Sequence, residues 1–250
     1  MSEIPPSRRI ADELRELIVS GTLEPGARLP SERELAKSHG TARNTARQAI
    51  AILMAEGLVE AQHGRGAFVR RWPQLRRLAH DRYARRYREA GKAPFQTEAE
   101  RQGRTARVDV MSIGPVPAPS RVAERLGIHE GEQVLLRRNR YRADREPVQL
   151  ADTYVLWAIA DGSPLLREVP APGGIYACLE DLGHPIGRMT EDVTARMPLP
   201  EEAAALEMGR GVPVIELFHT TFDRDGLAVE VTHSILPADR NLLSFELPVE

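Results

Sequence analysis

The sequence predicts an α/β (α+β) protein: a small helical N-terminal unit, then a larger unit with a mixed, largely antiparallel sheet and short helices. Three observations predict this fold class. Apolar residues recur at helical spacing in three short stretches before residue 57. Two strand-like segments then surround a glycine-containing turn. Beyond residue 94, strand-like segments follow one another directly, without the strand–helix alternation of a parallel sheet.

The composition is that of a globular protein with two domains. The chain has 250 residues, of which 42% are apolar and 28% are charged, a balance typical of soluble proteins. No run approaches the roughly 18 apolar residues of a membrane span, and the first residues lack a secretion signal. Cys178 is the only cysteine, so no intrachain disulfide can form. We therefore expect a cytoplasmic protein with no membrane partner.

The charges are divided unevenly along the chain. Residues 1–92 carry 18 Lys and Arg against 11 Asp and Glu, whereas residues 93–250 carry 16 against 25. A basic excess confined to one end indicates a nucleic-acid partner for that end only.

The N-terminal unit should contain three helices. The first is predicted over 8–20, where apolar residues fall at helical spacing. The second, over 32–38, follows a capping box in which Ser31 is the N-cap and Glu34 lies three residues on. A third helix begins near Thr41 or Ala42 and presents alanines and aliphatic residues on its inner face.

A hairpin follows the third helix. Its strands are predicted at 58–61 and 66–69, and its tip contains His63, Gly64 and Arg65. Three helices followed by a hairpin form a winged helix-turn-helix, in which the third helix lies in the DNA major groove. The glycine lets the wing backbone approach a sugar-phosphate surface, and the two neighbouring side chains are hydrogen-bond donors.

The third helix carries residues suited to reading bases. Arg43 and Arg47 are four apart and project from one face, with Asn44 beside them. Arginine can bond guanine bidentately and asparagine can read adenine. The combination of a capped second helix, paired arginines and a basic hairpin within 60 residues predicts binding to double-stranded DNA.

The basic stretch that follows is interpreted as a linker. Residues 70–92 contain nine Arg or Lys and few apolar residues. We therefore divide the chain into a DNA-binding domain (1–70), a basic linker (71–94) and a C-terminal domain (95–250).

The C-terminal domain is predicted to be rich in strands. Strands are expected at 104–114, 133–142, 147–156, 187–196, 213–223 and 227–236. Short helices are expected at 120–126, 175–182 and 201–206. Turn residues at 144–146 and 223–226 predict hairpins, and so an antiparallel arrangement.

The motifs of the first 70 residues strongly resemble the GntR family of bacterial transcription regulators. They are the runs 21–36, 47–49, 56–59 and 64–69. The resemblance implies a regulator, expected to be a repressor, that binds a palindromic operator as a homodimer. The family positions that contact DNA correspond to Arg33, Arg43, Asn44, Arg47, His63 and Gly64. One departure is Ala42, where the family has a hydroxyl residue; this leaves Thr41 to cap the helix.

Residues 95–250 resemble, more loosely, the UTRA domain of HutC-type GntR regulators. The motifs are 138–147, 174–176 with 179–183, 196–198 with 201–203, and 213–215 to 229–232. The resemblance implies a chorismate-lyase-like fold that binds a small-molecule effector. Other GntR regulators carry an all-helical domain with a metal-binding histidine cluster, which the strand-rich pattern disfavours.

The effector pocket is expected where strand parity brings polar residues to one sheet face. Sugar-phosphate binders of the family have two arginines at the positions of Asn139 and Tyr141, so the bidentate anion clamp is missing here. Glu230 either meets the ligand or forms an ion pair with Arg137 or Arg196. The predicted pocket residues are Phe95, Arg137, Asn139, Tyr141, Tyr176 and Glu230.

Two other functions are alternatives to effector-controlled DNA binding. One is an enzymatic activity retained in the C-terminal domain, but the seven histidines show no metal-binding spacing and Cys178 sits among apolar residues. The other is constitutive DNA binding with a purely structural dimerisation domain. We expect no catalytic residues, no metal and no cofactor.

Overall fold

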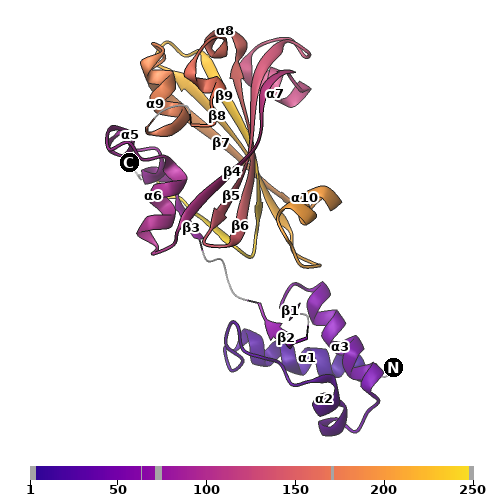
Figure 1. Ribbon diagram of the computed structural model, residues 1–250. Coiled ribbons are helices and arrows are strands. Elements are labelled where there is room, and N and C mark those ends of the chain that lie inside the picture. Colours follow the sequence, from indigo (N-terminus) through magenta and orange to yellow (C-terminus); the bar gives the residue numbers. More distant parts are fainter. Residues whose placement is uncertain (1–3, 63, 71–74, 170–171, 248–250) are drawn as a thin grey trace.

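A computed structural model describes residues 4–62, 64–70, 75–169 and 172–247. Figure 1 shows a small helical domain and a larger domain built around a twisted sheet. No helix among the described residues is long and apolar enough to cross a membrane.

The N-terminal domain has the predicted three helices and hairpin. Its elements are α1 (Pro6–Val19), α2 (Glu32–Ser38), α3 (Arg43–Ala55), β1 (Val59–Gln62) and β2 (Gly66–Val69). The inner faces of α1 and α3 pack together through a buried cluster that includes Leu14 and Leu53. The capping box is confirmed: Ser31 accepts from the Glu34 amide, and Glu34 accepts from the Ser31 amide at 2.7 Å.

The start of α3 differs from the prediction. Its N-cap is Ala42, and no side chain caps it. The expected cap by Thr41 is wrong, because Thr41 lies one residue too early. Its amide instead bonds to the Ala36 carbonyl at 2.9 Å and closes the turn after α2.

The stretch predicted as a linker is folded from Leu75 onward. It forms β3 (Leu75–Leu78), α4 (Ala79–Arg82) and α5 (Arg85–Glu89), followed by α6 (Pro94–Arg101). β3 pairs in parallel with the last strand, β10 (Asn241–Ser244). Its charges are matched by the larger domain, since Arg88 pairs with Glu180 at 3.1 Å. Pairing with distant carboxylates lets this basic segment pack against the sheet.

The larger domain contains a six-stranded antiparallel sheet in the order β4-β5-β6-β9-β8-β7. The strands match the six predicted ones closely. They are β4 (Ala106–Pro117), β5 (Gln133–Ala143), β6 (Glu146–Leu156), β7 (Ile186–Arg196), β8 (Val214–Asp223) and β9 (Ala228–Pro237). The predicted antiparallel α+β fold is therefore confirmed, whereas β3 and β10 were not predicted.

Short helices cover both faces of the sheet (Figure 1). α7 (Ser120–Leu126) and α10 (Pro200–Ala205) lie on one face. The other face carries α8 (Trp157–Ala160), a 3-10 turn at Pro164–Leu166 and α9 (Gly174–Asp181). The face under α9 also receives the segment from β3 to α6, and the cavity described below lies between them.

Candidate nucleic-acid interface and ligand cavity

The outer face of α3 presents the predicted base-reading residues to solvent. Arg43, Asn44 and Arg47 are exposed, and 63% of the Arg47 side chain is accessible. The opposite face is held in the core by Ala46, Ala49 and Leu53. Because packing uses only that inner face, the charged face is free for a partner.

A carboxylate at the start of α2 holds both arginines of α3. Arg47 donates two hydrogen bonds to Glu32, at 2.9 and 3.0 Å, and Arg43 lies 3.6 Å from it. The hydrogen bond from Arg47 lowers the pKa of Glu32. Arg33, beside Glu32, is exposed on α2. Glu32 was not predicted from the sequence, although its place next to Arg33 was a usable signal.

The wing is basic and has a backbone that only glycine adopts easily. Gly64 is exposed with a φ of 71°, and the guanidinium of Arg65 lies 5.5 Å from the centre of the Phe68 ring. Arg28 packs against Gly66 and brings another guanidinium to the hairpin. His63 lies outside the described residues.

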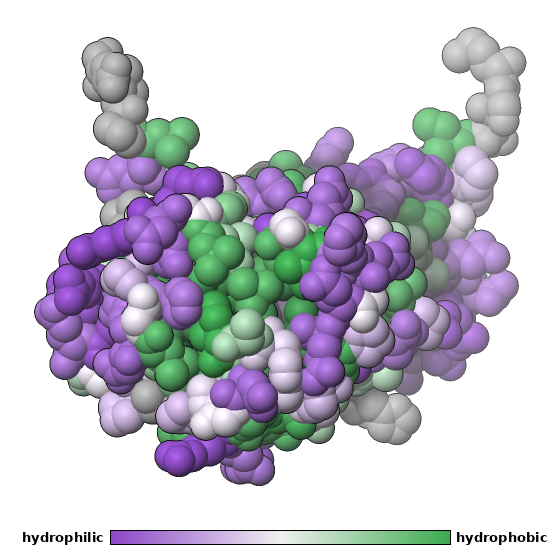
Figure 2. All heavy atoms as spheres, turned by 90° about the horizontal axis from the view of Figure 1, so that it is seen from above, coloured by the Kyte–Doolittle hydropathy of each residue, from purple (hydrophilic) through white to green (hydrophobic). Residues whose placement is uncertain are grey.

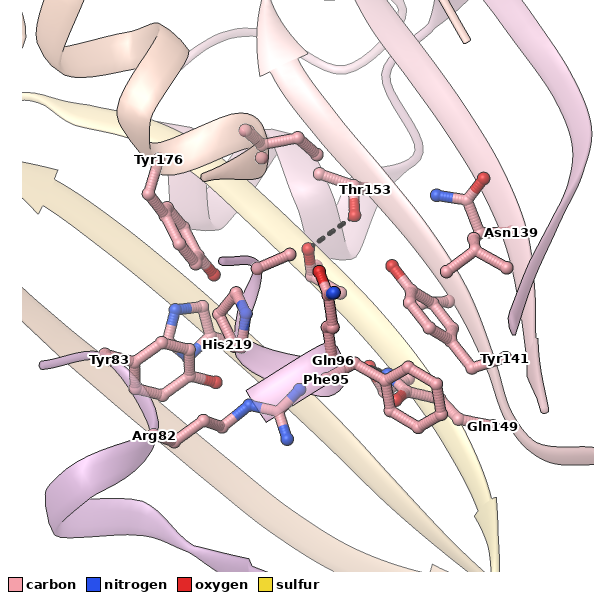
Figure 3. A pocket seen from close by; sticks show the side chains of 18 of the residues that line it. Arg82, Tyr83, Phe95, Gln96, Asn139, Tyr141, Gln149, Thr153, Tyr176 and His219 are labelled. Atoms are coloured by element: carbon pink, nitrogen blue, oxygen red, sulfur yellow. Dashed lines mark hydrogen bonds between the residues drawn. The ribbon is translucent and has the colours of Figure 1, made fainter. Parts of the chain in front are cut away.

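A cavity of about 630 Å³ lies on the sheet face beneath α9. All six predicted pocket residues line it, and Figure 3 shows Asn139 and Tyr141 on one side with Tyr176 across from them. Aromatic rings form much of the wall: Phe95 meets Tyr141 edge to face at 5.0 Å. The family resemblance together with strand parity predicted that Asn139 and Tyr141 line the pocket, and both do.

Several further residues line the cavity and were missed. Gln149 and Thr153 share strand parity on β6, so the alternation that located Asn139 could have located them. Four more come from β8 or the folded linker, namely His219, Arg77, Arg82 and Tyr83. The linker residues carry no sequence signal, because only tertiary packing turns that segment inward.

The two linker arginines form a buried charged wall. Arg82 hydrogen-bonds to Glu98, and the Arg77 Nε lies 3.7 Å from the same carboxylate. Arg77 also donates to Gln149 at 2.7 Å, and Gln149 donates to Ser234 at 2.8 Å. Burial lowers the pKa of Arg77. Positions 139 and 141 lack the arginines of the sugar-phosphate binders, yet the guanidiniums of Arg77 and Arg82 reach the cavity from another segment.

Glu230 is held by hydroxyl groups rather than by an arginine. It is 1% exposed and accepts hydrogen bonds from Thr221, at 2.6 Å, and from Thr232. Burial raises the pKa of Glu230. The ion pair considered with Arg137 or Arg196 is not formed.

A histidine continues this hydrogen-bonded chain across the cavity floor. His219 Nε2 lies 3.1 Å from the Thr221 hydroxyl, and Nδ1 lies 3.3 Å from Glu191. Tyr83 stacks on the imidazole at 4.6 Å and donates to Glu191 at 3.0 Å. Although burial opposes it, the hydrogen bond with His219 lowers the pKa of Glu191. These groups are satisfied by one another.

Three buried polar atoms of cavity-lining residues have no hydrogen-bond partner among the described residues: the Nε atoms of Arg82 and Arg137 and the Oδ1 of Asn139. Arg137 donates to the carbonyls of Leu165, Arg167 and Glu168, but its Nε is unpaired. The Oδ1 of Asn139 is likewise unpaired. Buried polar groups are nearly always hydrogen-bonded, so this wall offers two donors and one acceptor to a bound molecule.

Comparisons with known proteins match both halves of the chain. Residues 6–69 match the bacterial regulatory proteins of the gntR family, and residues 101–241 match the UTRA domain. An HTH-type transcriptional regulator of Streptomyces coelicolor is 32% identical over 98% of this chain and 93% of its own length. The transcriptional repressor NagR of Bacillus subtilis is 28% identical over 96% of this chain and 93% of its own. A crystal structure of a GntR-family regulator has 30% identity, 99% coverage of both chains and a TM-score of 0.69.

Proposed function

Because this chain belongs to the GntR family of transcription regulators and carries a UTRA effector-binding domain, we propose that it is a repressor that binds a palindromic operator as a homodimer. A small molecule in the sheet-domain cavity then changes that binding. The family and the relatives above are transcription regulators rather than enzymes. A DNA partner also makes the cytoplasm the expected compartment.

The observation that carries DNA reading is the exposed basic face of α3. Arg43, Asn44 and Arg47 are the side chains that a groove-inserted helix would bring to base edges. We propose that Arg33 on α2 contacts the DNA backbone. The wing contacts DNA through His63, Gly64 and Arg65. Glu32 occupies the two α3 arginines in the absence of DNA, and phosphates and bases would replace it.

Exposed apolar side chains on the larger domain support the homodimer. In Figure 2, apolar residues gather in the middle of the end face of this domain, inside a polar rim. The edge strands of the sheet also expose apolar residues, with Val108 and Met111 on β4 and Val193 on β7. Edge strands with apolar surface are well suited to pairing with a second copy.

The cavity indicates the chemistry of the effector without naming it. A ligand acceptor would meet the Nε of Arg137, and a ligand donor would meet the Oδ1 of Asn139. Aromatic walls from Phe95, Tyr141 and Tyr176 would enclose an apolar or planar portion. We therefore propose a polar small molecule that carries both an acceptor and a donor.

Selection of duplexes from a random library by the full-length protein tests this function. We expect an inverted repeat, protected symmetrically in footprinting, and a dimer in sedimentation velocity. A metabolite panel in thermal unfolding should then contain stabilising compounds, since a ligand at 100 times its Kd adds about 2.7 kcal/mol. Stabilising compounds should alter the affinity for the selected duplex. Selection without any enriched sequence would exclude the function, and stabilisation without any effect on DNA would leave a constitutive binder.

A further inference from the structure

β10 and the turn before it connect the cavity wall with the part of the larger domain that contacts the DNA-binding domain. Leu243 and Phe245, in and just after β10, line the cavity. Four residues before Leu243, Asp239 forms an ion pair with Arg70 of the DNA-binding domain. We infer that β10 transmits effector binding by moving Asp239, so that the Arg70–Asp239 pair acts as a latch between the domains.

The latch joins the two domains tightly. Arg70 Nη1 lies 2.7 Å from Asp239 Oδ2, and the two side chains are 9% and 15% exposed. The backbone amide of Arg70 bonds to the Leu58 carbonyl at 2.9 Å, so the guanidinium is fixed to the base of the wing. Because the pair is mostly shielded from water, it responds strongly to small displacements and is weakly screened by salt.

The turn that carries Asp239 is clamped to the sheet domain. Arg240 donates to the carbonyls of Pro147 and Leu206, both at 2.6 Å. Asn241 donates to the Val148 carbonyl at 2.9 Å. These bonds hold the two residues after Asp239 to β6 and to the end of α10, so a shift of β10 that carries Arg240 and Asn241 is passed to Asp239 and the latch.

β10 is in turn coupled to the charged wall of the cavity. It pairs in parallel with β3, in a register that places Leu243 beside Arg77. Arg77 contacts Glu98 and Gln149 in that wall. A molecule that fills the cavity thus meets both strands of this two-stranded sheet, and the adjoining turn lies at the domain boundary.

A second close contact between the two domains constrains the position of the DNA-binding domain. The loop before β8 approaches the end of α3 so closely that a Cβ atom at Gly211 would lie 2.5 Å from the Met54 carbonyl oxygen. A cleft of about 590 Å³ flanked by Arg70 and Asp239 adjoins this contact. The DNA-binding domain is therefore seated by the Arg70–Asp239 ion pair, by a hydrogen bond from Arg70 to the Arg210 carbonyl at 3.4 Å, and by close backbone approaches at Gly211 and Gly57, with open space beside them.

This inference rests on the proposed effector function, but its test needs neither effector nor operator. Nitroxide labels are placed at exposed Lys37 on α2 and Glu201 on α10, in the full chain with Cys178→Ala. Labelled protein is diluted with unlabelled protein so that only distances within one chain are read. Pulsed dipolar spectroscopy should give one narrow distance peak.

The variants should separate a latch from an incidental contact. Asp239→Asn should abolish the narrow peak, and the charge swap Arg70→Asp with Asp239→Arg should restore it. Leu243→Phe and Phe245→Ala, which change the cavity wall alone, should each shift or abolish the peak. Combining either with Asp239→Asn should add nothing. Glu89→Gln, in an exposed pair on α5, is the matched control and should leave the peak unchanged.

Two results would overturn the inference. A narrow peak retained in Asp239→Asn would show that the ion pair does not hold the domains. An unchanged peak in both Leu243→Phe and Phe245→Ala, each verified as folded by its thermal transition, would show that β10 does not transmit. Failure to find an operator or an effector would contradict the proposed function. It would not change the measured distances between the labels, which test the latch on their own.

Discussion

Arginine is used in opposite ways by the two domains. On α3, Arg43 and Arg47 stand in solvent and share Glu32. In the cavity wall, Arg77 and Arg82 are enclosed by protein and share Glu98. Each cluster has two guanidiniums and one carboxylate, yet the exposed cluster is open to another partner, which we propose is DNA, whereas the buried cluster is enclosed by protein.

The difference teaches that basic charge in a sequence does not by itself locate a DNA surface. Much of the N-terminal basic excess lies in the segment after residue 70, and part of it builds the wall of the cavity. A guanidinium acts as a ligand for DNA when the fold leaves it exposed, and as part of the scaffold when a buried acid faces it.

The largest effect is expected from removing the buried acid. Glu98→Gln leaves the guanidiniums of Arg77 and Arg82 buried without their carboxylate. Breaking such a cluster should lower the free energy of unfolding by about 3–5 kcal/mol, measured by urea denaturation. Glu89→Gln is the control, because its carboxylate is 65% exposed and a surface pair contributes under about 1 kcal/mol. Equal losses in the two variants would erase the contrast between the clusters.

The exposed cluster should matter for DNA and hardly for folding. Arg47→Ala should weaken binding to the selected duplex by about tenfold to a hundredfold, because a bidentate base contact is lost. The urea midpoint should stay near that of the wild type. Affinity is read by fluorescence anisotropy at fixed salt, with Arg85→Ala on α5 as the matched control. Unchanged selectivity in Arg47→Ala would mean that α3 does not read the bases.

Elements whose signals are local could be predicted from the sequence. The six strands of the main sheet follow from alternation and from turns such as that at Asp144, which has a positive φ of 58°. The capping box of α2 depends on two residues three apart. β10 and β3 could not be predicted, since a short parallel pair between segments far apart in sequence leaves no local pattern.

The residues that line the cavity could be predicted only in part, because some of them are brought there by contacts between segments far apart in sequence. The family resemblance pointed to Asn139, Tyr141 and Glu230, and parity on β5 added Arg137 to the same face. The inward turn of Arg77 and Tyr83 depends on Glu98 and Glu191, which are remote in sequence. Burial of a charged residue is decided by such partners, so composition alone assigned this segment to a linker.

Glu230 is a buried acid without an arginine partner in the described part of the chain, and it extends the comparison because its effect on stability should depend on pH. Burial raises the pKa of Glu230, so its contribution to stability is full below the unfolded pKa of about 4.3 and is lost as pH rises through the folded value. Glu230→Gln removes this titration. As pH rises across this range, the wild type should therefore lose unfolding free energy relative to Glu230→Gln. Urea titrations at several pH values give the difference. A flat difference would mean that the hydroxyls of Thr221 and Thr232 fully offset the burial.

The smallest expected effect is at the acid of the exposed cluster. Glu32→Gln releases the Arg47 guanidinium and removes a negative charge close to the path of the phosphates, so binding to the selected duplex should tighten by about threefold, mainly through a faster association rate. The gain should shrink at high salt, because the repulsion it relieves is screened. Glu16→Gln on α1 removes the same charge elsewhere in the domain and controls for net charge. A fall in affinity together with relaxed selectivity would instead mean that Glu32 positions Arg47 for its base, and the exposed cluster would then resemble the buried one in depending on its carboxylate.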